Sequence, residues 1–323
     1  MRKANLCVGN ALVPCAAFAG VVMLIATPAR AHEGPRIWID NDNGQIATYT
    51  SDNDLDPTVY SPSRFFSTDL APYFGIFTNE FPGYEVKQFD LHVNSGTTFG
   101  YRIAGPLLYY QASGNHFVTV RDAFPPPQHA NPPQVAVVLS SDDTRSGDLP
   151  VSGFNFFTFN SVGDHSHLSY LFLGDGLTAS DGPSGSYLLP LQLTSTSLAT
   201  SKVFYLMLNK EASESEISDG TAIGQAVSTA KPGDANYDGH VNLADLSILV
   251  ANNGRIGNVW WGTADFTADG KVNTLDFNLL AGNYDTPATF AADLLRAQSS
   301  VPEPISLPML LVCGYFLRRS CRR

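Results

Sequence analysis

Oxygen-bearing side chains recur at fixed spacing in "GDANYDGHVNLADL", residues 233–246, directly before an apolar helix pattern. If Asp234 is position 1, oxygen donors fall at positions 1, 3, 5, 9 and 12, with Gly239 at position 6 and a backbone carbonyl at position 7. A hard cation needs six or more oxygens around one point, and glycine permits the sharp turn that gathers them. The spacing predicts a calcium loop with the ligands Asp234, Asn236, Asp238, His240, Asn242 and Asp245.

The pattern returns 31 residues later in "ADFTADGKVNTLDF", residues 264–277, again followed by an apolar helix pattern. Each copy holds three carboxylates, which repel one another without a cation, so we predict one calcium ion per loop and a loose module without metal. Two solvated acidic turns are the alternative, but two copies in register make chance a poor explanation. We also expect Val241 and Val272, both at position 8, to pair. The ligands of the second loop are Asp265, Thr267, Asp269, Lys271 through its carbonyl, Asn273 and Asp276.

An ordinary EF-hand has a helix before each loop, but Pro232-Gly233 precedes the first loop and "GNVWWGTA" precedes the second. A duplicated loop-then-helix unit with Asp at position 12 resembles a type I dockerin over about residues 232–286. The resemblance implies two units packed with near two-fold symmetry and a cohesin-like or other surface protein as partner. Thr267 departs from the family's Asn or Asp at position 3. The family's recognition pair at positions 10 and 11 often carries hydroxyl groups, whereas here it is Leu243-Ala244 in one copy and Thr274-Leu275 in the other.

Residues 32–210 are predicted to form a β-sandwich or jelly-roll-like domain, because short apolar runs alternate with Gly, Pro, Asn, Asp and Ser. Asn43-Gly44 predicts a hairpin between runs 36–39 and 46–49. Segment 211–231 is small, polar and acidic, and although part of it suits a short helix, we expect a linker before a module at 232–290. The fold class is therefore mainly β with a small α-helical calcium module. Other expected strands are 86–93, 98–103, 117–120, 135–139, 154–159, 168–173, 188–193 and 203–208.

Charge and cysteine positions narrow the function classes. The net charge of −11 argues against nucleic acid, whose phosphates call for a basic face. The four cysteines lie at 7, 15, 313 and 321, so no disulfide is expected between residues 16 and 312.

The N-terminal 31 residues read as a secretory signal peptide. A basic start is followed by an apolar stretch that ends near Ile25 and by the small-x-small cleavage site Ala29-Arg30-Ala31. A transmembrane anchor is the alternative, although Asn10 and Pro14 interrupt the apolar stretch. Cleavage would leave His32 as the mature N-terminus of an exported protein.

The last 23 residues combine "VPEP", a 13-residue apolar run and an arginine cluster. The arrangement resembles a PEP-CTERM sorting signal over 301–323. That resemblance implies recognition of Pro302, Glu303 and Pro304 by an exosortase. The apolar run is shorter than the roughly 20 residues of a stable span, which fits transient anchoring in the inner membrane with the arginines in the cytoplasm. Processing would then release the chain to the cell surface or the exterior, and a plain tail anchor is the alternative.

Catalytic patterns are scarce in the β region. Residues 32–210 contain neither G-x-S-x-G nor H-E-x-x-H and hold only three glutamates. Glu80 and Glu85 flank a turn and are either a glycosidase pair or solvated loop charges. We expect a non-catalytic surface protein, with a carbohydrate-active enzyme as the alternative and polysaccharide as a further candidate partner.

Two histidines in "GDHSHLSYLFL", residues 163–173, are the other candidate site. His165 and His167 are two apart on an expected strand, so both imidazoles point to one face, which should continue to Ser169. They suit zinc or copper if His32, His92 or His116 adds a third ligand, and a solvated strand face is the alternative. Residues 35–225 diffusely resemble uncharacterised PEP-CTERM-tailed exported proteins that share an H-x-H-L strand. This resemblance implies that zinc regulates some of these proteins.

Overall fold

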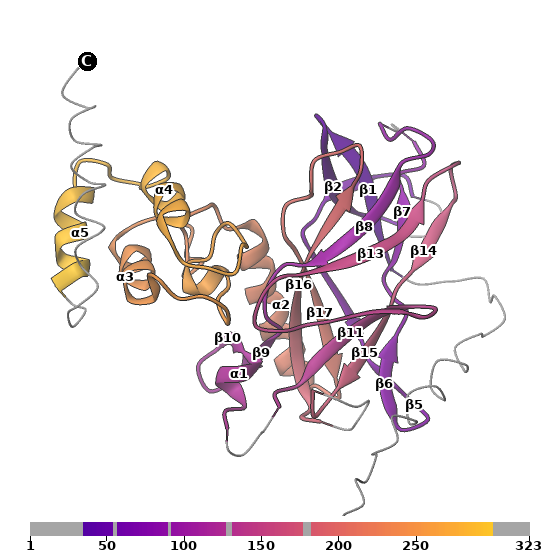
Figure 1. Ribbon diagram of the computed structural model, residues 1–323, viewed down its shortest axis with the longest axis horizontal. Helices are drawn as coiled ribbons and strands as arrows, with labels where there is room; N and C mark the ends of the chain where they lie inside the picture. The colour runs from indigo at the N-terminus through magenta and orange to yellow at the C-terminus, as the bar shows by residue number, and fades with distance from the viewer. Residues whose placement is uncertain (1–34, 54–56, 90–91, 127–130, 177–181, 300–323) are drawn as a thin grey trace, which may run out of the picture. The chain divides into compact units, whose positions relative to one another are not determined.

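The computed structural model describes residues 35–299, apart from 54–56, 90–91, 127–130 and 177–181, and all of them belong to one compact unit. The expected signal peptide, His32 and the sorting motif Pro302, Glu303 and Pro304 lie outside the described residues. Strands dominate as far as Lys210 and helices follow, which confirms a mainly β chain with a small helical C-terminal region (Figure 1).

The described strands form three sheets. Most pairs are antiparallel, but β1 pairs with β7 and β17 pairs with β4 in parallel. The first sheet has the order β14 (His165–His167), β7 (Gly83–Val86), β1 (Arg36–Asp42), β2 (Gln45–Ser51), β3 (Tyr60–Pro62). The second has the order β10 (His116–Thr119), β9 (Leu108–Gln111), β16 (Gly185–Ser195), β17 (Phe204–Lys210), β4 (Phe65–Asp69), with β8 (Thr98–Ile103) pairing to β16 and to β13 (Val151–Thr158). The third has the order β12 (Asp142–Arg145), β11 (Gln134–Leu139), β15 (Ser169–Leu173), β6 (Ile76–Asn79), β5 (Ala71–Tyr73).

One apolar cluster joins the three sheets. Ile37 of β1, Leu206 of β17 and Phe172 of β15 belong to it and are fully buried. The hydroxyl groups of Tyr84 on β7 and Tyr170 on β15 are hydrogen-bonded at 2.6 Å, which links the first and third sheets inside this core. The three sheets therefore bury their apolar residues in one shared core.

The hairpin expected around Asn43-Gly44 is confirmed. Asp42 pairs with Gln45, so the two residues between them form the whole turn, and their φ angles of 52° and 90° suit asparagine and glycine. The other expected strands have counterparts except 86–93, which is wrong because it overlaps a strand only at Val86, the end of β7. Strands β3 to β6, β9 and β12 had no counterpart among the expected ones.

Helix α2 (Glu214–Thr229) occupies most of the segment expected as a linker. Ser213 caps it in a capping box with Glu216, and the helix packs on β17, β16, β10 and β4. Segment 211–231 is therefore largely a structural part of the β region. We call β1–β17 with α2 and the short helix α1 (Val120–Ala123) the β domain.

The remaining helices belong to a second core and form the calcium-loop module, residues 232–299. They are α3 (Leu243–Asn252), α4 (Thr274–Gly282), α5 (Phe290–Ser299) and the 3₁₀ turn η2 (Trp261–Thr263). The cluster runs from Ala235 to Ala297, and α5 contributes Leu294 and packs on α3. The packed module thus extends beyond residue 290, the expected end. Among the described helices, none has the length and apolar character to cross a membrane.

Candidate calcium-binding loops

The two predicted calcium loops repeat the same hydrogen bonds at the same positions. At position 1, Asp234 accepts from the N–H of Gly239 and Asp265 accepts from that of Gly270, both at 3.0 Å. The aspartates at position 5, Asp238 and Asp269, each accept at 2.9 Å from the N–H two residues later. These bonds close each loop around its glycine, which has φ near +85° in both copies.

The last predicted ligand of each loop also helps to cap the following helix. The aspartates at position 12 accept at 2.9 Å from the backbone N–H of the asparagine at position 9, while that asparagine caps the helix. The result is a capping box at the start of α3 and of α4. Asp245 and Asp276 also accept from N–H groups near position 3, which ties the end of each loop to its beginning.

Each loop is bound by the segment that follows the helix of the other unit. The carbonyl of Val272 accepts from Gly254 after α3, and that of Val241 accepts from Asp285 after α4. Both valines are fully buried in the same apolar cluster, and their carbonyls bond to these segments. The exchange has the near two-fold character that the dockerin resemblance implies.

The buried carboxylates are electrostatically suited to a cation. Asp234, Asp245, Asp265 and Asp276 are at most 2% exposed. Burial raises the pKa of each, and for Asp265 burial together with the Asp276 carboxylate raises the pKa to about 7. A divalent cation would reverse both effects, because it neutralises the group that burial and like charge disfavour.

One buried oxygen lacks a protein donor and tests the fit directly. Asp234 Oδ1 is buried and has no hydrogen-bond partner, while the Oδ2 atom of the same carboxylate is bonded. Buried acceptors are nearly always satisfied, so this atom fits a cation ligand. The loop residues thus fit calcium. Asp, Asn and Thr side chains with the carbonyls at position 7 would hold it, and calcium would supply charge neutralisation and loop closure.

The histidine pair is brought together, but the expected continuous strand is wrong. The rings of His165 and His167 have centroids 5.4 Å apart. Strand β14 ends at His167, pairs with β7 in the first sheet, and Ser169 starts β15 in the third sheet, so Ser169 is not on the histidine face. The Nδ1 atoms of both rings lie within 3.1 Å of backbone carbonyls, those of Gly163 and Glu80.

A third metal ligand is not placed beside this pair within the described residues. Across those residues, no group of three or more His, Cys, Asp or Glu is arranged to hold a metal ion. His92 instead contacts the Asp40 carboxylate through Nδ1. This finding covers the calcium loops as well, since each has three aspartates, and a calcium ion there would also draw on amide, hydroxyl and carbonyl oxygens. His32 lies outside the described residues, and the zinc site stays a prediction.

The two candidate catalytic glutamates have different environments. Glu85 is fully buried in β7, where it is paired with Arg36 and accepts from Gln88 Nε2 at 3.0 Å. The solvated-loop alternative is therefore wrong for Glu85. The Glu85 carboxylate is thus held by Arg36 in a structural ion pair. Glu80 contacts His167 Nδ1 through its backbone carbonyl.

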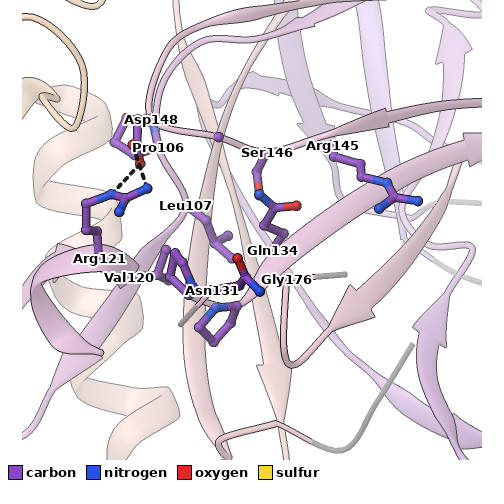
Figure 2. Close-up of a pocket in the computed structure, with 13 residues that line it drawn as sticks. Pro106, Leu107, Val120, Arg121, Asn131, Gln134, Arg145, Ser146, Asp148 and Gly176 are labelled. Atoms are coloured by element: carbon purple, nitrogen blue, oxygen red, sulfur yellow. Dashed lines mark hydrogen bonds and ion pairs between the residues drawn. The ribbon is translucent and has the colours of Figure 1, made fainter. Parts of the chain in front are cut away.

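The β domain also has a cavity of about 410 Å³ beside α1 and the ends of β11 and β12 (Figure 2). Asp148, the one carboxylate among the lining residues that the structure describes, accepts from Arg121 Nε at 2.9 Å and lies 2.7 Å from Arg121 Nη2. Arg145 is paired with Asp143. The lining that the structure describes thus offers paired charges and amides, and lacks the two carboxylates of a glycosidase. Sequence reasoning missed this cavity because its lining comes from five separate segments.

Comparison with known proteins identifies the loop region. Residues 232–283 match the family model of the dockerin type I domain. This match indicates a calcium-binding module for protein interaction in that segment, and it does not extend to the β domain. No curated protein matches the chain. Among solved structures, the CooA pilin subunit from enterotoxigenic Escherichia coli is similar at 9% identity, covering 47% of this chain and 91% of the pilin. Its TM-score of 0.22 is too low to support an argument.

Proposed function

We propose that this chain is an exported, non-catalytic protein whose residues 232–299 form a calcium-stabilised module that binds a surface protein. Through this module the β domain would be attached to that partner. The observation that carries the proposal is the repeated bonding pattern of the two loops around buried carboxylates. Calcium would hold both helix starts in place, and these starts carry the exposed residues Ala244, Thr274 and Leu275. A cohesin-like protein is the partner that the dockerin match favours.

A pull-down from envelope extract tests this function. The full mature chain is immobilised with calcium or with chelator, beside the double variant Asp234→Ala/Asp265→Ala. A partner that is retained only with calcium, and lost with the double variant, supports the proposal. Retention that is the same with calcium and with chelator would contradict it.

Export and sorting are part of the proposal and rest on the sequence ends. Replacing Pro302, Glu303 and Pro304 by alanine should leave the precursor in the inner membrane with its tail, because an exosortase would no longer recognise it. Mass spectrometry of the wild-type mature protein should then show that residues after about 304 are missing. An exported chain that still ends at Arg323 would contradict processing.

A further inference from the structure

The turn of the second calcium loop lies against the β domain, whereas that of the first is open. A Cβ atom built on Gly270 would lie 2.6 Å from Pro150 Cδ and 3.1 Å from Leu149 Cδ2. At the matching position of the first loop, a Cβ atom built on Gly239 would have no other atom within 4 Å. Gly270 is accordingly buried while Gly239 is exposed. The asymmetry contrasts with the matched hydrogen bonds inside the loops.

Polar contacts fix the same region to the β domain. The backbone N–H of Asn258 donates to the Asp148 carbonyl at 2.7 Å, and its side-chain amide lies 3.3 Å from both oxygens of Asp122. Arg102 on β8 donates to the carbonyl of Ala268 at 2.8 Å. Ala268 lies between the ligands Thr267 and Asp269, so this bond acts on the backbone that places both.

An apolar anchor adjoins these contacts. Trp260 is 6% exposed and belongs to a cluster with Tyr110, Tyr205 and Val227, on the face of the second sheet that α2 also covers. Buried aromatic anchors surrounded by polar contacts are typical of specific interfaces.

We infer that the second calcium loop is a docking surface for the β domain of the same chain, and that calcium in this loop secures the contact. The inference rests on the proposed calcium function. The exposed helix starts at Ala244 and Leu275 lie outside the docked turn, so docking leaves them available to another protein. The module would then present its partner-binding residues in a fixed orientation to the β domain.

The link between metal and docking is reciprocal. Calcium holds the 267–270 backbone in the geometry that Arg102, Leu149 and Pro150 contact, so an ion that stabilises the loop stabilises the contact. By linkage, docking must raise the calcium affinity of the second loop by the same factor. This would offset the weaker ligand Thr267, whereas the first loop would gain nothing.

Hydrogen–deuterium exchange of the full chain tests the inference, with segments 147–151 and 255–261 reporting the two sides of the contact. In wild type, chelator should speed exchange in both segments by about tenfold or more, as a typical coupling energy implies. Asn258→Asp should do so even with calcium, because it places a carboxylate against Asp122. The charge-matched control is Asn278→Asp on the exposed surface of α4, which should behave as wild type.

A matched glycine pair separates docking from loop strain. Gly270→Ala and Gly239→Ala impose the same left-handed strain, with φ of +81° and +86°, but only the first meets Pro150. Gly270→Ala should speed exchange at 147–151, and Gly239→Ala should leave that segment protected.

Calorimetry on the same samples distinguishes the two ways of failing. If both ions bind but chelator and Asn258→Asp leave exchange at 147–151 unchanged, the docking inference is overturned and the calcium function stands. If no calcium binds, the proposed function fails, and calcium control of the contact fails with it.

Discussion

Asp40 shows how single residues hold charge inside the β domain. It is 2% exposed and lies 3.1 Å from Lys87 Nζ, which in turn lies 4.6 Å from the centroid of the Tyr49 ring. Burial alone would raise the pKa of Asp40, but hydrogen bonds from His92, Asn41 and Lys87 outweigh burial and lower it. A lowered folded-state pKa contributes stability above the unfolded pKa, and this contribution is lost as pH falls through the folded pKa.

Lys87→Met should therefore destabilise the β domain strongly at neutral pH. Removing one partner of a buried ion pair leaves an uncompensated charge, which costs about 3–5 kcal/mol. At a pH below the lowered pKa of Asp40 the carboxyl is neutral, so the difference from wild type should shrink. Urea denaturation at neutral and acidic pH measures both effects. Lys202→Met, at an exposed position, is the control and should stay within about 0.5 kcal/mol. A cost that is equal at both pH values would refute the ion-pair explanation.

The ligands of the calcium loops stay a prediction that local spacing supports, whereas the buried ion pairs have no local sequence signal. Every predicted ligand of a loop lies within 12 residues, so the spacing along the chain is enough to propose which oxygens would surround an ion. Arg36 and Glu85 are 49 positions apart and Asp40 and Lys87 are 47 apart. Their pairing depends on the parallel register of β1 and β7, which no local pattern specifies.

At the scale of elements, α2 illustrates close packing made possible by small residues. Gly224 faces the ring of Phe65 and Gly220 faces Met207 and Phe117. The helix approaches the sheet through glycine and serine as well as Val227, so the sequence lacks the strong apolar period that identifies amphipathic helices. That composition led us to expect a linker. Short strands such as β3 and β5 were missed for a similar reason, since three residues carry almost no alternation.

Gly224→Ala should destabilise the protein although alanine favours helices. The added Cβ would lie 2.2 Å from Phe65 Cε2, and overpacking typically costs about 1–3 kcal/mol against a propensity gain of roughly 1 kcal/mol. At Gly220 the nearest atom is the flexible Met207 sulfur at 3.3 Å, so Gly220→Ala should be near neutral or stabilising. Thermal unfolding of both variants measures this difference. A Gly224→Ala protein at least as stable as Gly220→Ala would show that α2 does not pack as described.

At the scale of the whole molecule, the β domain and the module each have an apolar core, and the cluster around Trp260 joins them. The module differs from the β domain because, beside its apolar core, it buries carboxylates that repel one another. The net charge of −11 adds to this repulsion. Calcium binding should therefore matter chiefly for residues 232–299.

Calcium should raise the thermal stability of the module more than that of the β domain. A ligand that binds only the folded state at 100 times its dissociation constant adds about 2.7 kcal/mol per site. We expect far-ultraviolet circular dichroism to show loss of helix signal with chelator, while the strand signal persists. Magnesium at the same concentration is the control, because it demands a tighter octahedral geometry and should stabilise less. Equal unfolding curves with calcium and with chelator would contradict the metal's structural role.

Calorimetric titration of the full mature chain with calcium tests the central claim most directly. Wild type should bind two ions, with dissociation constants between roughly 10⁻⁷ and 10⁻³ M. Asp234→Ala and Asp265→Ala should each leave one site, because each removes the first carboxylate of one loop, and the double variant should leave none. A wild-type stoichiometry of one or zero, or a double variant that still binds two ions, would contradict the account.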